Sequence, residues 1–149
     1  MNKQRIAMLI CAVAGIIATF MPWFNMPLIG SVNGTQANND GWITLALFAV
    51  PLLLSMLGNR TKSLEGAMLF IAIAAGLVAA GIAVYRIIDF KNKISPLEDN
   101  AFGKMLTSTV SVGAGLYLVA VAGLAVLITA FALKDKQTAA VNARVEEPA

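Results

Sequence analysis

The chain has 149 residues, of which 58% are hydrophobic and only 13% are charged. A soluble domain carries about 25% charged residues. Here the apolar residues are gathered into long blocks, which is typical of membrane-spanning segments. The net charge of +3 is small, and the chain has no basic stripe interleaved with aromatic residues. The composition therefore argues against nucleic-acid binding.

Four apolar blocks predict four membrane-spanning helices, at residues 6–24, 42–57, 67–88 and 108–133. A spanning helix needs about 20 residues to cross about 30 Å of hydrocarbon, so the second block is short. Helices are expected because open strands would leave backbone groups unpaired in lipid. The predicted fold class is an all-α membrane protein, an antiparallel bundle of four transmembrane helices within residues 1–133.

The first block also has the basic start of a signal peptide, in Lys3 and Arg5. A cleavage site needs small residues, however, and Ala18-Thr19-Phe20 places Phe where a small residue would be required. We interpret the block as an uncleaved span.

A polar segment without Lys or Arg separates the first two spans. Trp23 and Trp42 bracket it, and indole rings prefer the membrane interface. Asn33-Gly34 is a strong hairpin-turn signal, and the sequence NNDG at residues 38–41 indicates a turn and a helix N-cap. We expect an ordered extracytoplasmic cap containing a small β-hairpin, although a flexible polar linker fits the same composition.

The distribution of Lys and Arg predicts the orientation. With the N-terminus in the cytoplasm, the inner bases are Lys3, Arg5, Arg60, Lys62, Lys134, Lys136 and Arg144. The outer bases are then Arg86, Lys91, Lys93 and Lys104. This excess on the inner side agrees with the positive-inside rule. We expect a multi-pass protein of the cytoplasmic (inner) membrane with both termini in the cytoplasm.

The remaining connections differ in length. Residues 58–63 form a short loop, so the second and third spans are expected to be an antiparallel pair. Residues 134–149 have balanced charge and few large apolar side chains. They are predicted to be a disordered cytoplasmic tail.

Small residues recur in the third and fourth spans, where they let helix backbones approach closely. The candidate packing positions are Gly76, Ala80, Ser111, Gly115 and Gly123. Such faces either close the four-helix bundle or form the interface of a homo-oligomer, and the sequence leaves both alternatives open.

Residues that carry chemistry are scarce. The chain has no His and one Cys, so a metal site or an internal disulfide is not expected. Cys11 lies within the first span, where a thiol is most often a small packing group. No acid or base lies deep in any span, whereas proton-coupled carriers mark their pathway with such residues. The sequence therefore predicts no cofactor and no enzymatic activity.

Arg86 and Asp89 are the charges that lie against the apolar body of a span. Their three-residue spacing fits a local ion pair on one helix face. As an alternative, Arg86 could meet Asp40 of the first loop. The candidate partner-binding residues are Trp23, Asn33, Asp40, Trp42, Arg86 and Asp89.

Three stretches occur in a recognisable order: "PWF" before a polar loop that ends in "DGWITLAL", "YRIIDF" at the end of the third span, and "SVGAGLYLVAVAGL" in the fourth. With these stretches the chain resembles small four-span bacterial membrane proteins that have no assigned activity. The resemblance implies a fold and a membrane location but no reaction. The first loop is also similar in plan to that of claudin-type four-span proteins, whose loop cysteine pair is absent here.

These observations favour a small non-enzymatic membrane protein that acts by contact, as an accessory, adaptor or immunity-type partner. The alternative is an oligomeric pore or a small-solute transporter. The expected partners are the lipid bilayer and either another membrane protein or further copies of this chain. No nucleic-acid partner is expected.

Overall fold

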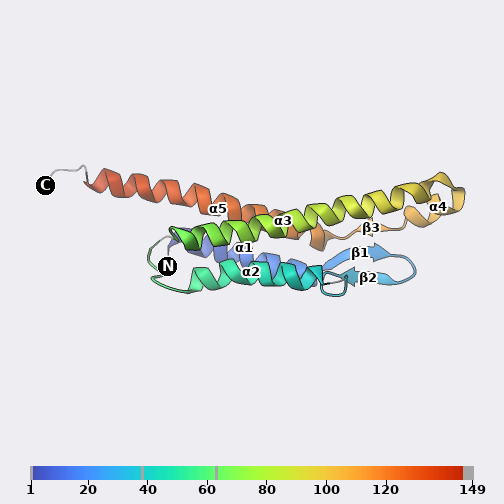
Figure 1. Ribbon diagram of the computed structural model, residues 1–149, viewed down its shortest axis with the longest axis horizontal. Helices are drawn as coiled ribbons and strands as arrows, with labels where there is room; N and C mark the ends of the chain where they lie inside the picture. The colour runs from blue at the N-terminus through green and yellow to red at the C-terminus, as the bar shows by residue number, and fades with distance from the viewer. Residues whose placement is uncertain (1, 38, 63, 146–149) are drawn as a thin grey trace.

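The computed structural model describes residues 2–37, 39–62 and 64–145. It is an elongated, mostly helical molecule (Figure 1). The elements in chain order are α1 (Lys3–Phe20), β1 (Pro22–Met26), β2 (Gly30–Asn33), α2 (Asp40–Met56), α3 (Ala67–Ile94), the 3-10 helix η1 (Ser95–Asp99), α4 (Ala101–Thr107), β3 (Ser111–Val112) and α5 (Ala114–Val145). The strands and α4 lie at one end, here called the sheet end, and the start of α1 and the end of α5 lie toward the other (Figure 1).

Helices α1, α2, α3 and α5 pack side by side. Helix α1 contacts α2 and α5, and α3 contacts the same two helices. The chain runs toward the sheet end in α1 and α3 and away from it in α2 and α5 (Figure 1). One core cluster, with Phe48 and Leu116, lies toward the sheet end, and a second, with Met8 and Val126, lies nearer the termini.

Three helical segments are long and apolar enough to cross a membrane: α1, α3 and the part of α5 from Ala114–Leu133. Helix α2 is apolar but shorter, with 17 residues. Helix α3 has 28 residues, which at 1.5 Å per residue is about 42 Å. Because a hydrocarbon core is about 30 Å thick, α3 is longer than is needed to cross a membrane.

The boundaries of the first predicted span need correction at the sheet end. Helix α1 ends at Phe20 rather than at residue 24, and the chain continues as strand β1. Pro22 explains the change, because proline has no N–H to continue the helix and forces the residue before it into an extended conformation. Met21 has that conformation, with ψ of 161°.

The fourth predicted span also begins later than expected. Residues 108–113 are outside α5, which starts at Ala114, and Ser111 belongs to strand β3. At its other end, α5 runs past the predicted boundary at Leu133 to Val145. Of the tail expected over residues 134–149, residues 146–149 lie outside the described residues. The third helix likewise continues past residue 88 to Ile94.

The strands form an antiparallel sheet in the order β2-β1-β3. The expected hairpin is present, but its turn is at residues 27–29 rather than at Asn33-Gly34. Gly30 ends this turn with φ of +85°, a conformation that glycine adopts without strain. Asn33 instead starts the next turn, where its carbonyl accepts hydrogen bonds from the N–H groups of Gln36 and Ala37, both at 3.0 Å.

Strand β3 was not expected from the sequence, and it pairs with β1 through Phe24 and Asn25. The N-cap expected near residues 38–41 is Asn39, but its side chain makes no capping hydrogen bond. Asn38 lies outside the described residues.

Candidate functional site at the sheet end

An ion pair joins α2 to α3 where the apolar helices meet the sheet. Arg86 Nε donates to Asp40 Oδ2, and the two side chains form a salt bridge. Arg86 Nη1 also lies 4.0 Å from Asp89 Oδ2. Asp89 in turn accepts a hydrogen bond of 2.9 Å from Lys93 Nζ. The sequence offered Asp89 and Asp40 as alternative partners of Arg86. In the structure Arg86 lies beside both carboxylates.

Asp40 is well placed for this role. It is the first residue of α2, and a carboxylate in the first turn interacts favourably with the partial positive charge of a helix N-terminus. Trp42, two residues later, has 59% of its surface exposed. It therefore stays available for the interfacial role that the sequence predicted.

Trp23 has a different position from the one expected. It is fully buried, and its Nε1 donates to the carbonyl of Ala18 at 3.2 Å. The indole belongs to the core cluster that also contains Phe48 and Leu116. Its predicted role as a partner-binding residue is therefore corrected to a core role.

The glycine-rich first loop lies directly on this indole. A Cβ atom at Gly34 would collide with the Trp23 ring and would lie 2.5 Å from the Thr19 carbonyl oxygen. The backbone of Gly34 in turn contacts Gly41. Asn33, the last residue of β2, is partly buried and accepts the turn hydrogen bonds through its carbonyl. Gly34 therefore has no room for a side chain, because its backbone packs against a buried aromatic ring.

A pair of stacked rings ties the sheet to α3. The centroids of Phe24 in β1 and Phe90 in α3 are 4.5 Å apart, with 28° between the ring planes. These rings line a small hollow of about 220 Å³ with the charged residues Arg86, Asp89 and Lys93. Phe90 also lines a larger hollow.

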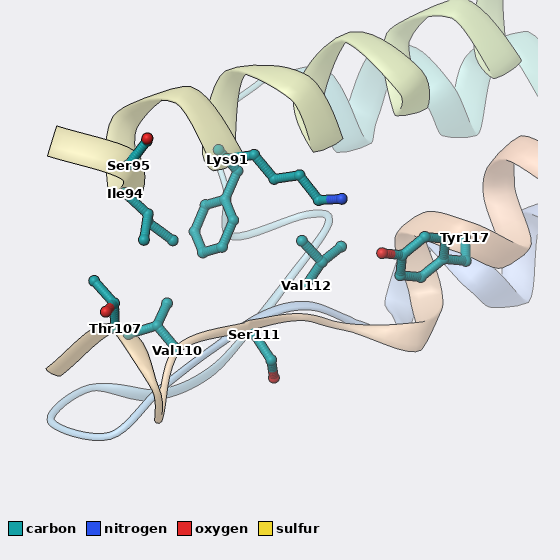
Figure 2. Close-up of a pocket in the computed structure, with 9 residues that line it drawn as sticks. Lys91, Ile94, Ser95, Thr107, Val110, Ser111, Val112 and Tyr117 are labelled. Carbon is teal, nitrogen blue, oxygen red and sulfur yellow. The ribbon is translucent and has the colours of Figure 1, made fainter. Parts of the chain in front are cut away.

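The larger hollow, here called the α3–β3 cleft, has a volume of about 540 Å³. It lies between the end of α3, the segment from α4 to β3, and the first turn of α5 (Figure 2). It is lined by Phe90, Lys91, Ile94, Ser95, Thr107, Val110, Ser111, Val112 and Tyr117.

The two ends of the α3–β3 cleft differ in polarity. In Figure 2 the Lys91 ammonium and the Tyr117 hydroxyl point toward each other at one end. Ile94, Val110 and Val112 present apolar side chains to the rest of the space (Figure 2). Among the described lining residues, one is cationic and none is acidic. The cleft therefore combines apolar side chains, the hydroxyl-bearing residues Ser95, Thr107 and Ser111, and one lysine among its described lining residues.

Large apolar side chains are exposed at the tip of the sheet end. Leu28 and Ile29, in the turn between β1 and β2, are 87% and 74% exposed, and Phe102 and Met105 on α4 are each 74% exposed. Single exposed apolar residues are common on proteins, but here the turn between β1 and β2 and helix α4 each carry two of them.

The predicted packing residues occupy close helix contacts, with one exception. Gly123 of α5 faces Gly76 and Ala80 of α3, and a Cβ at Gly123 would lie 2.6 Å from the Gly76 carbonyl oxygen. Gly115 lies against the Ala18 carbonyl, which a Cβ would approach to 2.8 Å. Ser111 is the exception, because it pairs with Asn25 in the sheet rather than packing between helices.

Sequence reasoning missed a buried polar cluster at the opposite end of the molecule. Arg5 is only 4% exposed, and its guanidinium donates to the carbonyls of Lys62 at 2.7 Å and Leu57 at 2.6 Å. Gln4 donates to the Ala130 carbonyl and accepts from the Leu64 N–H, both at 3.1 Å. These side chains join the start of α1 to the end of α2, to the loop before α3 and to α5.

Within the described part of the chain, no group of three or more His, Cys, Asp or Glu residues could hold a metal ion. Cys11 is a free, partly buried thiol on α1. Comparison of the chain with models of known protein families, with curated proteins and with solved structures found no match.

Proposed function

We propose that this chain is a four-span protein of the cytoplasmic membrane that acts by contact with a protein partner on the outer side. In this proposal α1, α2, α3 and α5 cross the membrane as an antiparallel bundle. Residues 22–39 and 87–113 form an extracytoplasmic lobe around the sheet. The short α2 fits because a bilayer can thin locally around a short span at modest cost.

The placement of basic residues supports this orientation. Lys3, Arg60 and Lys62 are exposed at the end opposite the sheet, and the Asn2 N–H donates to the Arg60 carbonyl at 2.8 Å. Toward the sheet end, the bases are balanced by acids: Arg86, Lys91, Lys93 and Lys104 against Asp40, Asp89, Glu98 and Asp99. The excess of basic residues therefore lies at the end opposite the sheet. A basic end belongs on the cytoplasmic side by the positive-inside rule, which directs the lobe outward.

The observation that carries the contact role is the apolar tip of the lobe, formed by Leu28, Ile29, Phe102 and Met105. The β1–β2 turn and α4, which carry these side chains, lie at the far end of the molecule from the start of α1 (Figure 1). Leaving them in water is unfavourable by about 25 cal/mol per Å² of apolar surface. A partner that covers them recovers this free energy.

The alternative of a pore or transporter has less support. The buried hydroxyls of Thr19, Thr44 and Ser55 donate to the carbonyl four residues earlier in their own helices. Their hydrogen bonds are thus used within the helix rather than along a path between helices. We therefore assign the protein no transported solute and no catalysed reaction.

Site-specific photocrosslinking tests the contact role. A photoreactive amino acid at position 102 should give a discrete adduct with another protein in membranes of the source cells. The substitution Ile29→Asp should abolish this adduct because it places a charge in the apolar contact. Ser31→Asp is the matched control, since Ser31 is exposed on the same hairpin but is not part of the tip.

Two results would contradict the contact role. One is an adduct at position 102 that survives Ile29→Asp. The other is the same adduct from a photoreactive residue at position 70, since Phe70 is exposed on the membrane-spanning part of α3. Ion conductance of the purified protein in liposomes would favour the pore instead.

A further inference from the structure

The α3–β3 cleft has the size of a small-molecule site. Its volume of about 540 Å³ falls within the range of roughly 300–1,000 Å³ that ligand pockets occupy. Ligand pockets are mostly apolar and contain a few convergent polar groups. Here Ile94, Val110 and Val112 supply apolar lining, Ser95, Thr107 and Ser111 add hydroxyl-bearing residues, and Lys91 and Tyr117 point toward each other (Figure 2).

The charge of the cleft specifies the charge of its ligand. Lys91 and Lys93, near the end of α3, differ in whether an acid pairs with them. Lys93 Nζ lies 2.9 Å from Asp89 Oδ2. Among the described side chains, no acidic group pairs with Lys91. The cleft therefore holds one uncompensated positive charge at its polar end, and this charge favours a ligand that carries a single negative charge.

The polar end of the cleft also lies where the lipid-facing surfaces begin. On α3, Val84 and Ile88 are exposed and precede Lys91 at helical spacing on the same face. On α5, Tyr117 precedes the exposed residues Val121 and Leu124. In the proposed orientation, Lys91 and Tyr117 thus stand at the outer membrane interface, and a molecule dissolved in the bilayer can reach them.

We propose that the α3–β3 cleft binds a single-chain amphipathic carboxylate taken from the bilayer. The carboxylate lies between the Lys91 ammonium and the Tyr117 hydroxyl, and the chain lies against Ile94, Val110 and Val112. Two donors and one positive charge match the two oxygens and the single charge of a carboxylate. This inference requires the membrane location but is independent of the contact role of the tip.

Photolabelling in nanodiscs of zwitterionic lipid tests the proposal with a defined probe. The probe is dodecanoate with a photoreactive diazirine near the end of its chain, and modified peptides are identified by mass spectrometry. The expected adducts lie within residues 90–95 and 107–117. Lys91→Gln should reduce them about tenfold, the loss expected for one charge-assisted hydrogen bond.

Matched controls separate binding in the cleft from partitioning into lipid. Lys93→Gln should leave the labelling unchanged, because Lys93 is already paired with Asp89 and does not line the cleft. The methyl ester of the probe should label the cleft weakly, since it carries no charge. Val110→Trp should fill the cleft and reduce labelling while the unfolding temperature stays within a few degrees of the unmodified protein.

Three results would overturn the proposal: equal losses for Lys91→Gln and Lys93→Gln, equal labelling by acid and ester, or adducts confined to the exposed faces of α3 and α5. The contact role would be unaffected by any of them, because its test uses the tip residues and a protein adduct.

Discussion

Arg86 of α3 is paired with Asp40, the first residue of α2, across 46 positions in the sequence. The pair joins two helices at the level where the apolar bundle ends and the lobe begins. Asp89 and Lys93 continue the line of charges along α3 toward the lobe. The lobe is therefore connected to the bundle by charge as well as by the stacked rings of Phe24 and Phe90.

A double-mutant cycle measures the strength of this connection. Asp40→Asn and Arg86→Gln should each lower the free energy of unfolding, and the two effects should be coupled by about 1 kcal/mol, the upper range for exposed pairs. Chemical unfolding in detergent gives the four values required. Lys93→Gln is the control, because its exposed pair should contribute less than about 0.5 kcal/mol. If the effects of Asp40→Asn and Arg86→Gln on the free energy of unfolding were additive, the ion pair would contribute nothing measurable to stability.

The contact between α3 and α5 should be sensitive to any added side chain. Gly76→Leu or Gly123→Leu should destabilise the bundle by about 1–3 kcal/mol, because overpacking displaces the opposing backbone. The same substitution at Gly81 is a matched control on α3, since a Cβ there would meet nothing within 4 Å. Thermal stability in detergent distinguishes the positions. If Gly76→Leu and Gly81→Leu were equally tolerated, the Gly76 face would not be a close contact.

Arg5 should be important for stability although its position at the N-terminus suggests a peripheral role. Arg5→Met would leave the carbonyls of Lys62 and Leu57 without their donor, which should lower the free energy of unfolding by about 3 kcal/mol. Arg5→Lys should recover little of the lost stability, because one ammonium cannot donate to both carbonyls as the planar guanidinium does. Lys3→Met, at an exposed neighbour, should be nearly neutral. Full stability of Arg5→Lys would show that charge alone matters at this site.

The packing of the first loop on Trp23 can be tested at Gly34. Gly34→Ala should force the loop away from the ring, at a cost of about 1–3 kcal/mol, and should accelerate hydrogen exchange of the β1 and β2 amides. A smaller ring would make room, so Trp23→Phe combined with Gly34→Ala should be less destabilising than the sum of the two changes. Ser31→Ala, at an exposed position, should leave exchange unchanged. Unaltered exchange in Gly34→Ala would mean that the loop is not held by this contact.

Features that depend on local pattern were predictable from the sequence. The second apolar block corresponds to α2, and the third begins, as predicted, where α3 does. The hairpin was expected from Asn33-Gly34, but its turn lies at residues 27–29, so its existence was predictable and its register was not. The pairing of Asp40 with Arg86 was among the alternatives because few other charges lie near the bundle.

Features that depend on distant backbone groups were not predictable. Strand β3 has two residues, and it is a strand only because Phe24 and Asn25 lie beside it. The partners of Arg5 are carbonyl groups, which every residue carries and which therefore leave no signal in the sequence. Trp23 follows an apolar helix, a position that suits a membrane interface as well as a core, and only the contact with Gly34 decides between them.

The accessibility of the two ends of the molecule shows whether the bundle spans the membrane with its lobe facing outward. In a protein with Cys11→Ser, single cysteines are introduced by Ile29→Cys at the tip of the lobe and by Thr61→Cys at the basic end, both exposed positions. A membrane-impermeant maleimide applied to intact cells should label position 29 and should reach position 61 only after the membrane is permeabilised. Labelling of position 61 but not 29 in intact cells, or equal labelling of both, would contradict a membrane-spanning bundle whose lobe faces outward.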